Sequence, residues 1–160
     1  MLDGELYLTP VPSLAHQSIV LAFLVAIRPY VDEHELGEGL PSPSDIEFSP
    51  TRLVQPDLFV VAFTAAGRPR SWEEIESLLL AVEVTSESTE WTDRNVKSRL
   101  YQSEGVEYWV VDGSTRSVER WRLSDDRPEV VTDVLEWQPR EGIEPLRIAL
   151  PELFADARHL

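Results

Sequence analysis

The feature that most constrains this fold is the run LLLAVEVT at residues 78–85. An unbroken apolar run of strand length is typical of a central β-strand that is covered on both faces. Glu83 interrupts the run, although a carboxylate is among the side chains least often buried without a partner. Because an unpaired buried charge costs several kcal/mol, we expect a cation or hydrogen-bond donors to compensate Glu83.

A second acid, Asp57, lies in the equally apolar stretch VQPDLFVV. Adjacent strands are about 4.7 Å apart, so the two carboxylates would converge on one hard cation if the strands that carry them pair. Two carboxylate oxygens, completed by waters and a substrate phosphate, suit Mg²⁺ or Mn²⁺. The alternative for Asp57 is a turn or bulge residue beside Pro56, and for Glu83 it is a buried structural ion pair.

The helix expected after Glu83 carries Asp93, Lys97 and Tyr101 at four-residue intervals, which places them on one face. Two acids, a divalent metal and a lysine suit phosphodiester hydrolysis, since the metal lowers the pKa of a water and the lysine stabilises developing negative charge. We therefore predict Asp57, Glu83 and Lys97 as catalytic residues. The alternative is that Asp93 and Lys97 form an ordinary ion pair on a solvated helix face.

The remaining pattern predicts a mixed α/β sheet in one domain, residues 1–160. Ser13 is expected to cap a buried helix from Leu14 to about Arg28, and Thr92 to cap a second helix that stops at Gly105. Expected strands cover 44–49 and 52–63, joined as a hairpin, then 78–85, 106–113, 117–123, 129–137 and 146–154, with a loop at 33–44 and one helical turn within 72–77. Pro56 requires the second strand to be bent, bulged or at an edge.

The composition limits the function. The chain has no Cys, which excludes disulfides and thiolate metal sites, and 29 acidic against 14 basic residues give a net charge of −15. This charge repels phosphate backbones unless Arg94, Arg99, Arg116, Arg120 and Arg122 form a local basic patch. The longest apolar stretch, Ile19–Ile27, is shorter than the roughly 20 residues that span a bilayer. We expect a cytoplasmic protein without a membrane segment.

Several stretches together resemble one known family. DGELYLTPVPSLAHQSIV, PSDIEF, VQPDLFVV, AVEVTSEST and GVEYWVVD, with the spacing of Asp93, Lys97 and Tyr101, are similar to the Uma family of restriction-endonuclease-like proteins (domain of unknown function 820) in the PD-(D/E)XK nuclease superfamily. The resemblance implies an α-β-β-β-α-β core with extra C-terminal strands. It also implies a divalent-metal-dependent nuclease site with Asp57 and Glu83 as metal ligands. The superfamily lysine would stand at Thr85, and Lys97 is expected to replace it from the helix.

Accessory roles are expected for His16, Gln55, Asp93 and Tyr101. His16 would bind a metal-bound water or a phosphate, although a lone His near a helix start is more often structural. Asp45 is more simply a polar residue at a strand start, and Ser86 and Ser88 more simply bind local backbone. Trp91, Trp109 and Trp121 could stack on bases. The alternative is burial for Trp109 and an oligomer interface for Trp91 and Trp121.

Two functions of different classes follow. The first is a Mg²⁺- or Mn²⁺-dependent endonuclease that hydrolyses DNA, with water as nucleophile. The second is a catalytically inactive nuclease-fold domain that acts as a protein-interaction or dimerisation module. The acidic surface, the tryptophans and the presence of Thr85 in place of the superfamily lysine favour it. Glycoside hydrolysis by Asp57 and Glu83 ranks last, because the sequence indicates no carbohydrate cleft.

Overall fold

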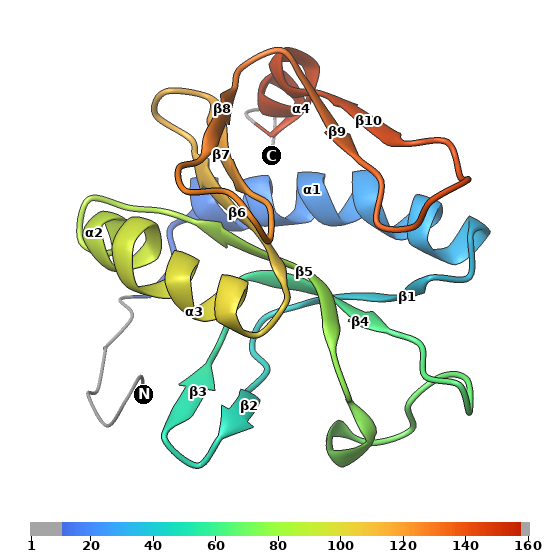
Figure 1. Cartoon of the computed structure of the whole chain (residues 1–160). Coiled ribbons are helices and arrows are strands. Elements are labelled where there is room, and N and C mark those ends of the chain that lie inside the picture. The colour runs from blue at the N-terminus through green and yellow to red at the C-terminus, as the bar shows by residue number, and fades with distance from the viewer. Residues whose placement is uncertain (1–10, 158–160) are drawn as a thin grey trace.

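A computed structural model of the chain describes residues 11–157, so the stretch DGELYLTP at 3–10 lies outside the described residues. Within 11–157, six strands form the main sheet, in the order β1-β4-β5-β6-β7-β8. Neighbouring strands are antiparallel except β5 and β6, which run parallel, so the predicted mixed sheet is confirmed (Figure 1). The strands are β1 (Gly37–Pro41), β4 (Leu58–Ala62), β5 (Leu78–Val84), β6 (Glu107–Asp112), β7 (Ser117–Trp121) and β8 (Glu129–Val131).

Helix α1 (Leu14–Glu33) begins where the sequence predicts, because the Ser13 side chain accepts a hydrogen bond from the backbone N–H of His16. Its predicted end at about Arg28 is wrong, since the helix continues through Pro29. A proline inside a helix removes one backbone hydrogen bond. Burial of Tyr30 and Val31 in the last turn outweighs that loss.

The predicted loop at 33–44 is wrong for Gly37–Pro41, which form the edge strand β1 against β4. Two glycines and a proline made this stretch look unlike a strand. The structure explains Gly37, because a Cβ there would collide with the carbonyl oxygen of Val61. An edge position also tolerates Pro41, which ends the strand.

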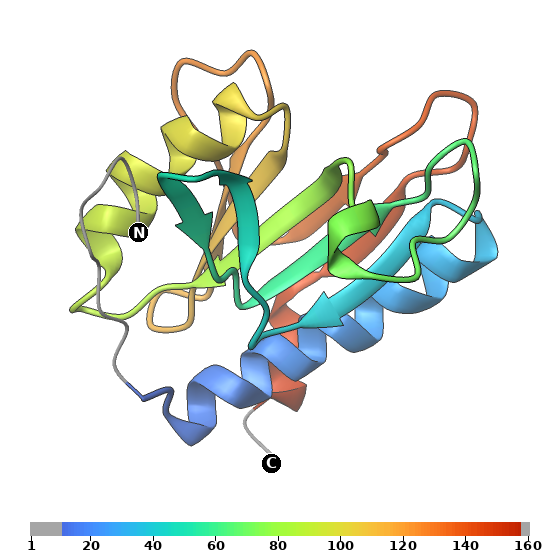
Figure 2. The ribbon, with the colours of Figure 1, turned by 90° about the horizontal axis from the view of Figure 1, so that it is seen from below.

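The predicted hairpin is confirmed, as β2 (Ile46–Ser49) and β3 (Arg52–Val54) form a separate two-stranded sheet. The predicted strand 52–63 is not continuous, because the chain leaves the hairpin at Gln55 and enters β4 at Leu58. Pro56 therefore lies at a bend between two sheets, and β4 runs between β1 and β5. As a result, Asp57 stands immediately before an interior strand. Figure 2 shows the hairpin projecting from the main sheet.

The apolar run 78–84 is β5, an interior strand flanked by β4 and β6, as predicted. A short 3₁₀ turn, η1 (Trp72–Glu74), precedes it, also as predicted. A helical run then crosses to the parallel strand β6, and it consists of α2 (Glu90–Thr92), the π-helical η2 (Asp93–Lys97) and α3 (Ser98–Ser103). The run begins at Glu90, so Thr92 is not its N-cap. Gly105, with φ of +72°, follows its end, as predicted.

The C-terminal segment adds a second small sheet of β9 (Val134–Trp137) and β10 (Leu146–Ala149). The predicted strand at 146–154 is wrong beyond Ala149, because Leu150–Asp156 form helix α4. Proline is favoured in the first turn of a helix, which suits Pro151. Leu150, Leu153 and Phe154 then bury the inner face of α4 at helical spacing.

Two apolar clusters cover the two faces of the main sheet. One contains α1, α4 and the β9–β10 sheet around Phe23, Trp109 and Trp137. The other contains α3 and the β2–β3 hairpin around Tyr101 and Tyr108. Helix α1 is long and apolar enough to cross a membrane, but core helices of soluble proteins also meet these criteria of length and composition. Six side chains of α1 are buried in the first cluster.

Candidate active site

The candidate site is a cavity at one end of the main sheet, where β4 begins and β5 and β6 end. It has a volume of ≈ 480 Å³. Its lining includes His16, Asp57, Glu83, Asp93 and Lys97, which come from α1, the segment before β4, β5 and the π-helical η2. Because β4 runs antiparallel to β5, its start lies beside the end of β5, and because β6 runs parallel to β5, its end lies there too. Residues that are far apart in sequence therefore meet at this end of the sheet.

Asp57 and Glu83 stand opposite one another. Leu58 pairs with Val82, and the same antiparallel register carried one step further places Asp57 across from Glu83. Asp57 Oδ2 accepts a hydrogen bond from the backbone N–H of Val84 at 2.8 Å and lies 3.1 Å from His16 Nε2. Asp57 Oδ1 has no hydrogen-bond partner among residues 11–157, and Asp57 lines the cavity, so this oxygen is available to a ligand.

A buried charge cluster surrounds Lys97. Its Nζ lies 2.9 Å from Glu83 Oε1 and 2.9 Å from Asp93 Oδ1. Glu83 is 4% exposed and Asp93 2% exposed. The cation expected beside Glu83 is therefore Lys97, and within the described part of the chain neither Asp57 nor Glu83 pairs with an arginine.

Three carboxylates, one lysine and one histidine set the electrostatics of this site. Burial raises the pKa of Glu83 to about 8, with Lys97 opposing the rise and Asp57 and Asp93 adding to it. Burial opposes the charge on Lys97, but Glu83 and Asp93 outweigh it and raise the pKa of Lys97 above its usual range. The hydrogen bond to Asp57 raises the pKa of His16 against the effect of burial. The acidic neighbours therefore raise the pKa of Lys97 and His16, whereas burial is the main cause of the rise at Glu83.

The π-helical turn η2 presents Asp93 and Lys97 to the cavity. A π-turn is rare and occurs mostly as a single turn within an α-helix, often at functional sites. Side-chain donors satisfy carbonyls of this turn: the Tyr108 hydroxyl donates to the Asp93 carbonyl at 3.1 Å, and the Ser98 hydroxyl donates to the Arg94 carbonyl at 2.8 Å. These bonds stabilise the wider turn and fix the direction of the two charged side chains.

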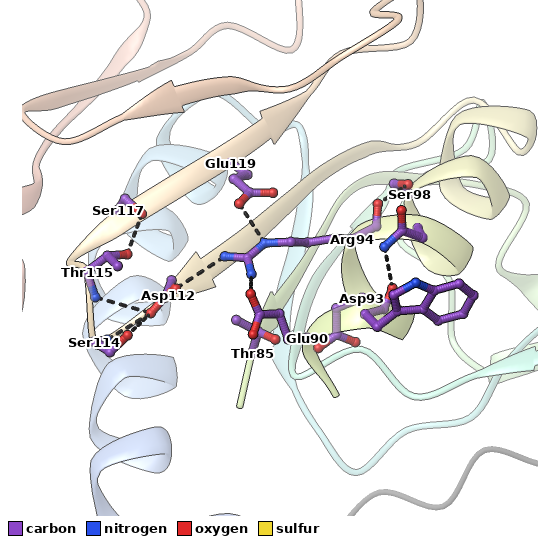
Figure 3. A network of polar contacts seen from close by, with 12 residues as sticks. Thr85, Glu90, Asp93, Arg94, Ser98, Asp112, Ser114, Thr115, Ser117 and Glu119 are labelled. Atoms are coloured by element: carbon purple, nitrogen blue, oxygen red, sulfur yellow. Dashed lines mark hydrogen bonds and ion pairs between the residues drawn. The ribbon is translucent and has the colours of Figure 1, made fainter. Parts of the chain in front are cut away.

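Arg94 ties the same turn to the sheet (Figure 3). Its guanidinium donates to Glu90, to Asp112 Oδ2 at 3.2 Å and to Glu119 Oε1 at 2.6 Å. Asp112 Oδ1 accepts hydrogen bonds from Ser114, which fixes the turn after β6. Arg94 is therefore a link between the crossover helix and the β6–β7 hairpin.

Two predicted accessory residues do not line the cavity. Tyr101 is fully buried beneath the site and stacks on Tyr108, with ring centroids 4.7 Å apart. Burial and the nearby carboxylates, Glu83 first, raise the pKa of Tyr101 well above its usual range, so its hydroxyl stays protonated. Gln55 is exposed, donates to Asp45 and does not line the cavity. Ser86 and Ser88 line the cavity rim and hydrogen-bond each other at 3.0 Å.

The predicted basic patch is largely neutralised. Arg94, Arg120 and Arg122 each form ion pairs with acidic side chains. Only Arg99 and Arg116 of the five arginines make no ion pair among the described residues. The site itself therefore draws its positive charge from Lys97 and, when protonated, from His16.

The donors at the cavity fit a hard divalent cation. Among residues 11–157, no cluster of three or more His, Asp or Glu is arranged to hold a metal ion by itself. Mg²⁺, however, is commonly held by one or two protein carboxylates, with waters and substrate phosphates completing its octahedron. The opposed carboxylates of Asp57 and Glu83 and the available Asp57 Oδ1 match that requirement.

The sheet order, the crossover helix and the cavity at the sheet end define an α/β protein with a restriction-endonuclease-like fold. The same fold occurs in the crystal structure of "a putative nuclease belonging to DUF820 from Anabaena variabilis ATCC 29413". The two structures agree with a TM-score of 0.76 at 15% sequence identity, over 98% of this chain and 89% of that chain. At this identity the likeness shows the fold alone.

The chain belongs to the Uma2 family, described as "Putative restriction endonuclease", which it matches over residues 1–155. The resemblance drawn from the sequence motifs is therefore confirmed. No curated protein matches the chain.

Sequence reasoning missed Asp112, and it assigned Arg94 to a basic patch whereas the structure pairs Arg94 with Asp112 and Glu119. Asp112 is the last residue of β6, which runs parallel to β5, and the carboxyl ends of parallel strands meet at one sheet edge. Lys97 is the only lysine in a chain whose other basic residues, apart from His, are all arginines. A single ammonium group placed at the acidic cavity indicates a role that arginine does not fill, since Arg and Lys differ in geometry and hydration.

Proposed function

We propose that this chain is a divalent-metal-dependent endonuclease that hydrolyses DNA phosphodiester bonds. The observation that carries the proposal is the meeting of Asp57, Glu83 and Lys97 in one cavity, with Lys97 Nζ 2.9 Å from Glu83. Membership of the Uma2 family supports the same class of reaction. DNA, Mg²⁺ or Mn²⁺, and hydrolysis itself belong to the proposal.

Asp57 and Glu83 would hold the cation between β4 and β5. When bound, a divalent cation neutralises phosphate charge and makes the attacking water more acidic. Glu83 would release its proton on becoming a ligand, because its pKa of about 8 keeps the carboxyl largely protonated at neutral pH in the metal-free protein.

Lys97 supplies the fixed positive charge. Its raised pKa keeps it protonated throughout the physiological range, so it stabilises negative charge and does not act as a general base. Asp93 orients its Nζ, and the π-turn orients both. His16 positions Asp57 by contacting Oδ2, which leaves Oδ1 available to the ligand.

Plasmid nicking tests the proposal. Supercoiled plasmid incubated with Mg²⁺ or Mn²⁺ should be converted to the nicked form by the wild-type protein, and not by Asp57→Ala or Glu83→Ala. Lys97→Met should lower the rate by about 100- to 1000-fold, the usual effect of losing one group that stabilises transition-state charge. Asp45→Asn is the matched control, since Asp45 is an exposed acid outside the cavity. Equal nicking by all variants would indicate a contaminating nuclease and remove the support for the proposal.

The second candidate is a catalytically inactive nuclease-fold domain that serves as a dimerisation or protein-interaction module. An apolar stripe on the outer face of α1 favours it, because Leu14, Leu21 and Val25 are 87%, 48% and 64% exposed. Thr85, at the position of the superfamily lysine, also favours it. Calorimetry that detects no Mn²⁺ binding, together with a concentration-independent dimer in sedimentation, would support this candidate over the enzyme.

A further inference from the structure

A second cavity lies on the opposite side of the helical run from the candidate active site. It has a volume of ≈ 460 Å³, and we call it the outer groove. Trp91, Asn95 and Arg99 line it at four-residue intervals, so they share one face of the helix. The neighbouring residues Glu90 and Trp91 line the active-site cavity and the outer groove respectively, so the N-terminal turn of the helix separates the two.

Trp91 provides a flat apolar surface in water. It is 68% exposed, although an indole buries a large area when it finds a partner. Its backbone is held in place, because the Asn95 side chain donates to the Trp91 carbonyl at 2.9 Å. Val96 and Leu100 add an apolar floor beside it. The groove therefore offers a stacking surface for a planar ring.

The outer groove is also free of acidic side chains, in a chain of net charge −15. Its described lining contains no Asp or Glu. Arg99 is exposed and makes no ion pair among residues 11–157, whereas Arg52, on the hairpin side of the groove, pairs with Glu104 at 3.1 Å. An exposed indole and an exposed guanidinium about two helical turns apart along one groove fit a base and a phosphate of the same strand.

We propose that the outer groove binds a single-stranded polynucleotide, with one unpaired base stacked on Trp91 and a phosphate on Arg99. The inference rests on the proposed nuclease function and names the conformation of its substrate: a strand that is unpaired beside the cleavage site. An unpaired strand is favoured for two reasons. Bases inside a duplex already cover one another's faces, and duplex DNA carries one phosphate per about 1.7 Å, which an acidic surface repels more strongly.

The test measures binding without cleavage. Fluorescence anisotropy follows a labelled strand of about ten nucleotides titrated with the Glu83→Gln protein in EDTA and low salt, with DNA, RNA and duplex forms of the same sequence compared. Trp91→Ala should weaken single-strand binding about 10-fold, as expected for loss of one stacked base. Arg99→Gln should weaken it and reduce the slope of log K against log salt by about 0.7, the value for one phosphate contact on a single strand.

Two variants serve as matched controls. Trp72→Ala removes an indole that is 53% exposed but borders a cavity lined by acids, among them Glu47, Glu73 and Glu76. Arg127→Gln removes an exposed arginine that also makes no ion pair among the described residues. Both should bind the strand as the parent protein does. The tighter of the DNA and RNA strands identifies the sugar that the groove prefers.

The inference is overturned by equal losses in Trp91→Ala and Trp72→Ala, by tighter binding of the duplex than of the single strand, or by no binding of any strand in low salt. Displacement of the strand by a polyglutamate peptide at similar affinity would reassign the groove to an acidic protein segment. The proposed function fails separately. Strand binding that depends on Trp91, without metal-dependent nicking, would support binding at the outer groove and reject the enzyme. Nicking that Trp91→Ala leaves unchanged would support the enzyme and reject binding at the outer groove.

Discussion

Lys97→Met tests the electrostatics of the site through stability alone. The substitution keeps the length and apolar stem of the side chain but removes the charge that lies 2.9 Å from Asp93, which is 2% exposed, and from Glu83. Removing one partner of a buried ion pair typically costs about 3–5 kcal/mol, because the remaining charge has no solvent to replace it. We expect that loss in urea unfolding at pH 7 with EDTA present, read by circular dichroism with a shared m-value.

A double-mutant cycle separates the charge from the packing. Asp93→Asn combined with Lys97→Met removes both charges, so the double variant should recover much of the stability that Lys97→Met loses. Arg147→Met is the matched control, because Arg147 pairs with Glu136 at the surface, where the two side chains are 65% and 47% exposed. Exposed pairs contribute about 0–1 kcal/mol. The reasoning is refuted if Lys97→Met costs no more than Arg147→Met, or if the double variant is less stable than Lys97→Met.

Three further predictions concern the same cluster. Folding raises the pKa of Glu83 from 4.5 to about 8, so the contribution of Glu83 to stability is full below pH 4.5 and is lost as the pH rises through 8. Between these two pH values the free energy of unfolding should fall by about 1.4 kcal/mol per pH unit. Glu83→Gln should lack this decline in urea unfolding with EDTA. Arg94→Met should lower the unfolding free energy by about 1–3 kcal/mol, since it leaves the partly buried Asp112 and Glu119 without a cation, and loss of helix α3 amide protection in hydrogen exchange should accompany it. Lys97 should resist acetylation by an amine reagent at pH 8, measured by peptide mass, because its raised pKa leaves little free amine, and Glu83→Gln should increase the rate.

Each of these predictions can fail in its own way. Parallel pH profiles for Glu83→Gln and the wild-type protein would show that Glu83 does not hold its proton in the fold. An Arg94→Met protein with wild-type stability would show that the network of Figure 3 is only a solvated surface cluster. Acetylation of Lys97 as fast as the N-terminal amine would place its ammonium group in solvent.

The sequence predicts the centre of the molecule better than its edges. The interior strand β5 follows from its unbroken apolar run, and burial on both faces leaves little alternative. The edge strand β1 does not follow from its sequence, since Gly37, Gly39 and Pro41 are poor strand formers. Pairing with β4 makes this stretch a strand. Helix α4 was hidden for a related reason: a short run of apolar residues is compatible with strand or helix until its packing partners are known.

The candidate site divides in the same way. Asp57 and Glu83 were visible because each acid interrupts an apolar run, and helical spacing linked Asp93 to Lys97. The Arg94 contacts with Asp112 and Glu119 could not be predicted, because they join segments whose relative placement depends on the whole sheet. The π-turn could not be predicted either, since its side-chain donors include Tyr108 from a strand later in the chain. The assignment of residues 1–160 to one domain stays a prediction.

The central claim is that Asp57 and Glu83 together hold one divalent cation. Crystals soaked in Mn²⁺ and measured for anomalous scattering test it directly, because manganese gives a signal that water and sodium do not. The account predicts a single strong peak in the cavity, about 2.0–2.4 Å from a carboxylate oxygen of each residue, and its loss in Asp57→Asn. A cavity without a peak, or a peak that contacts neither carboxylate, would contradict it.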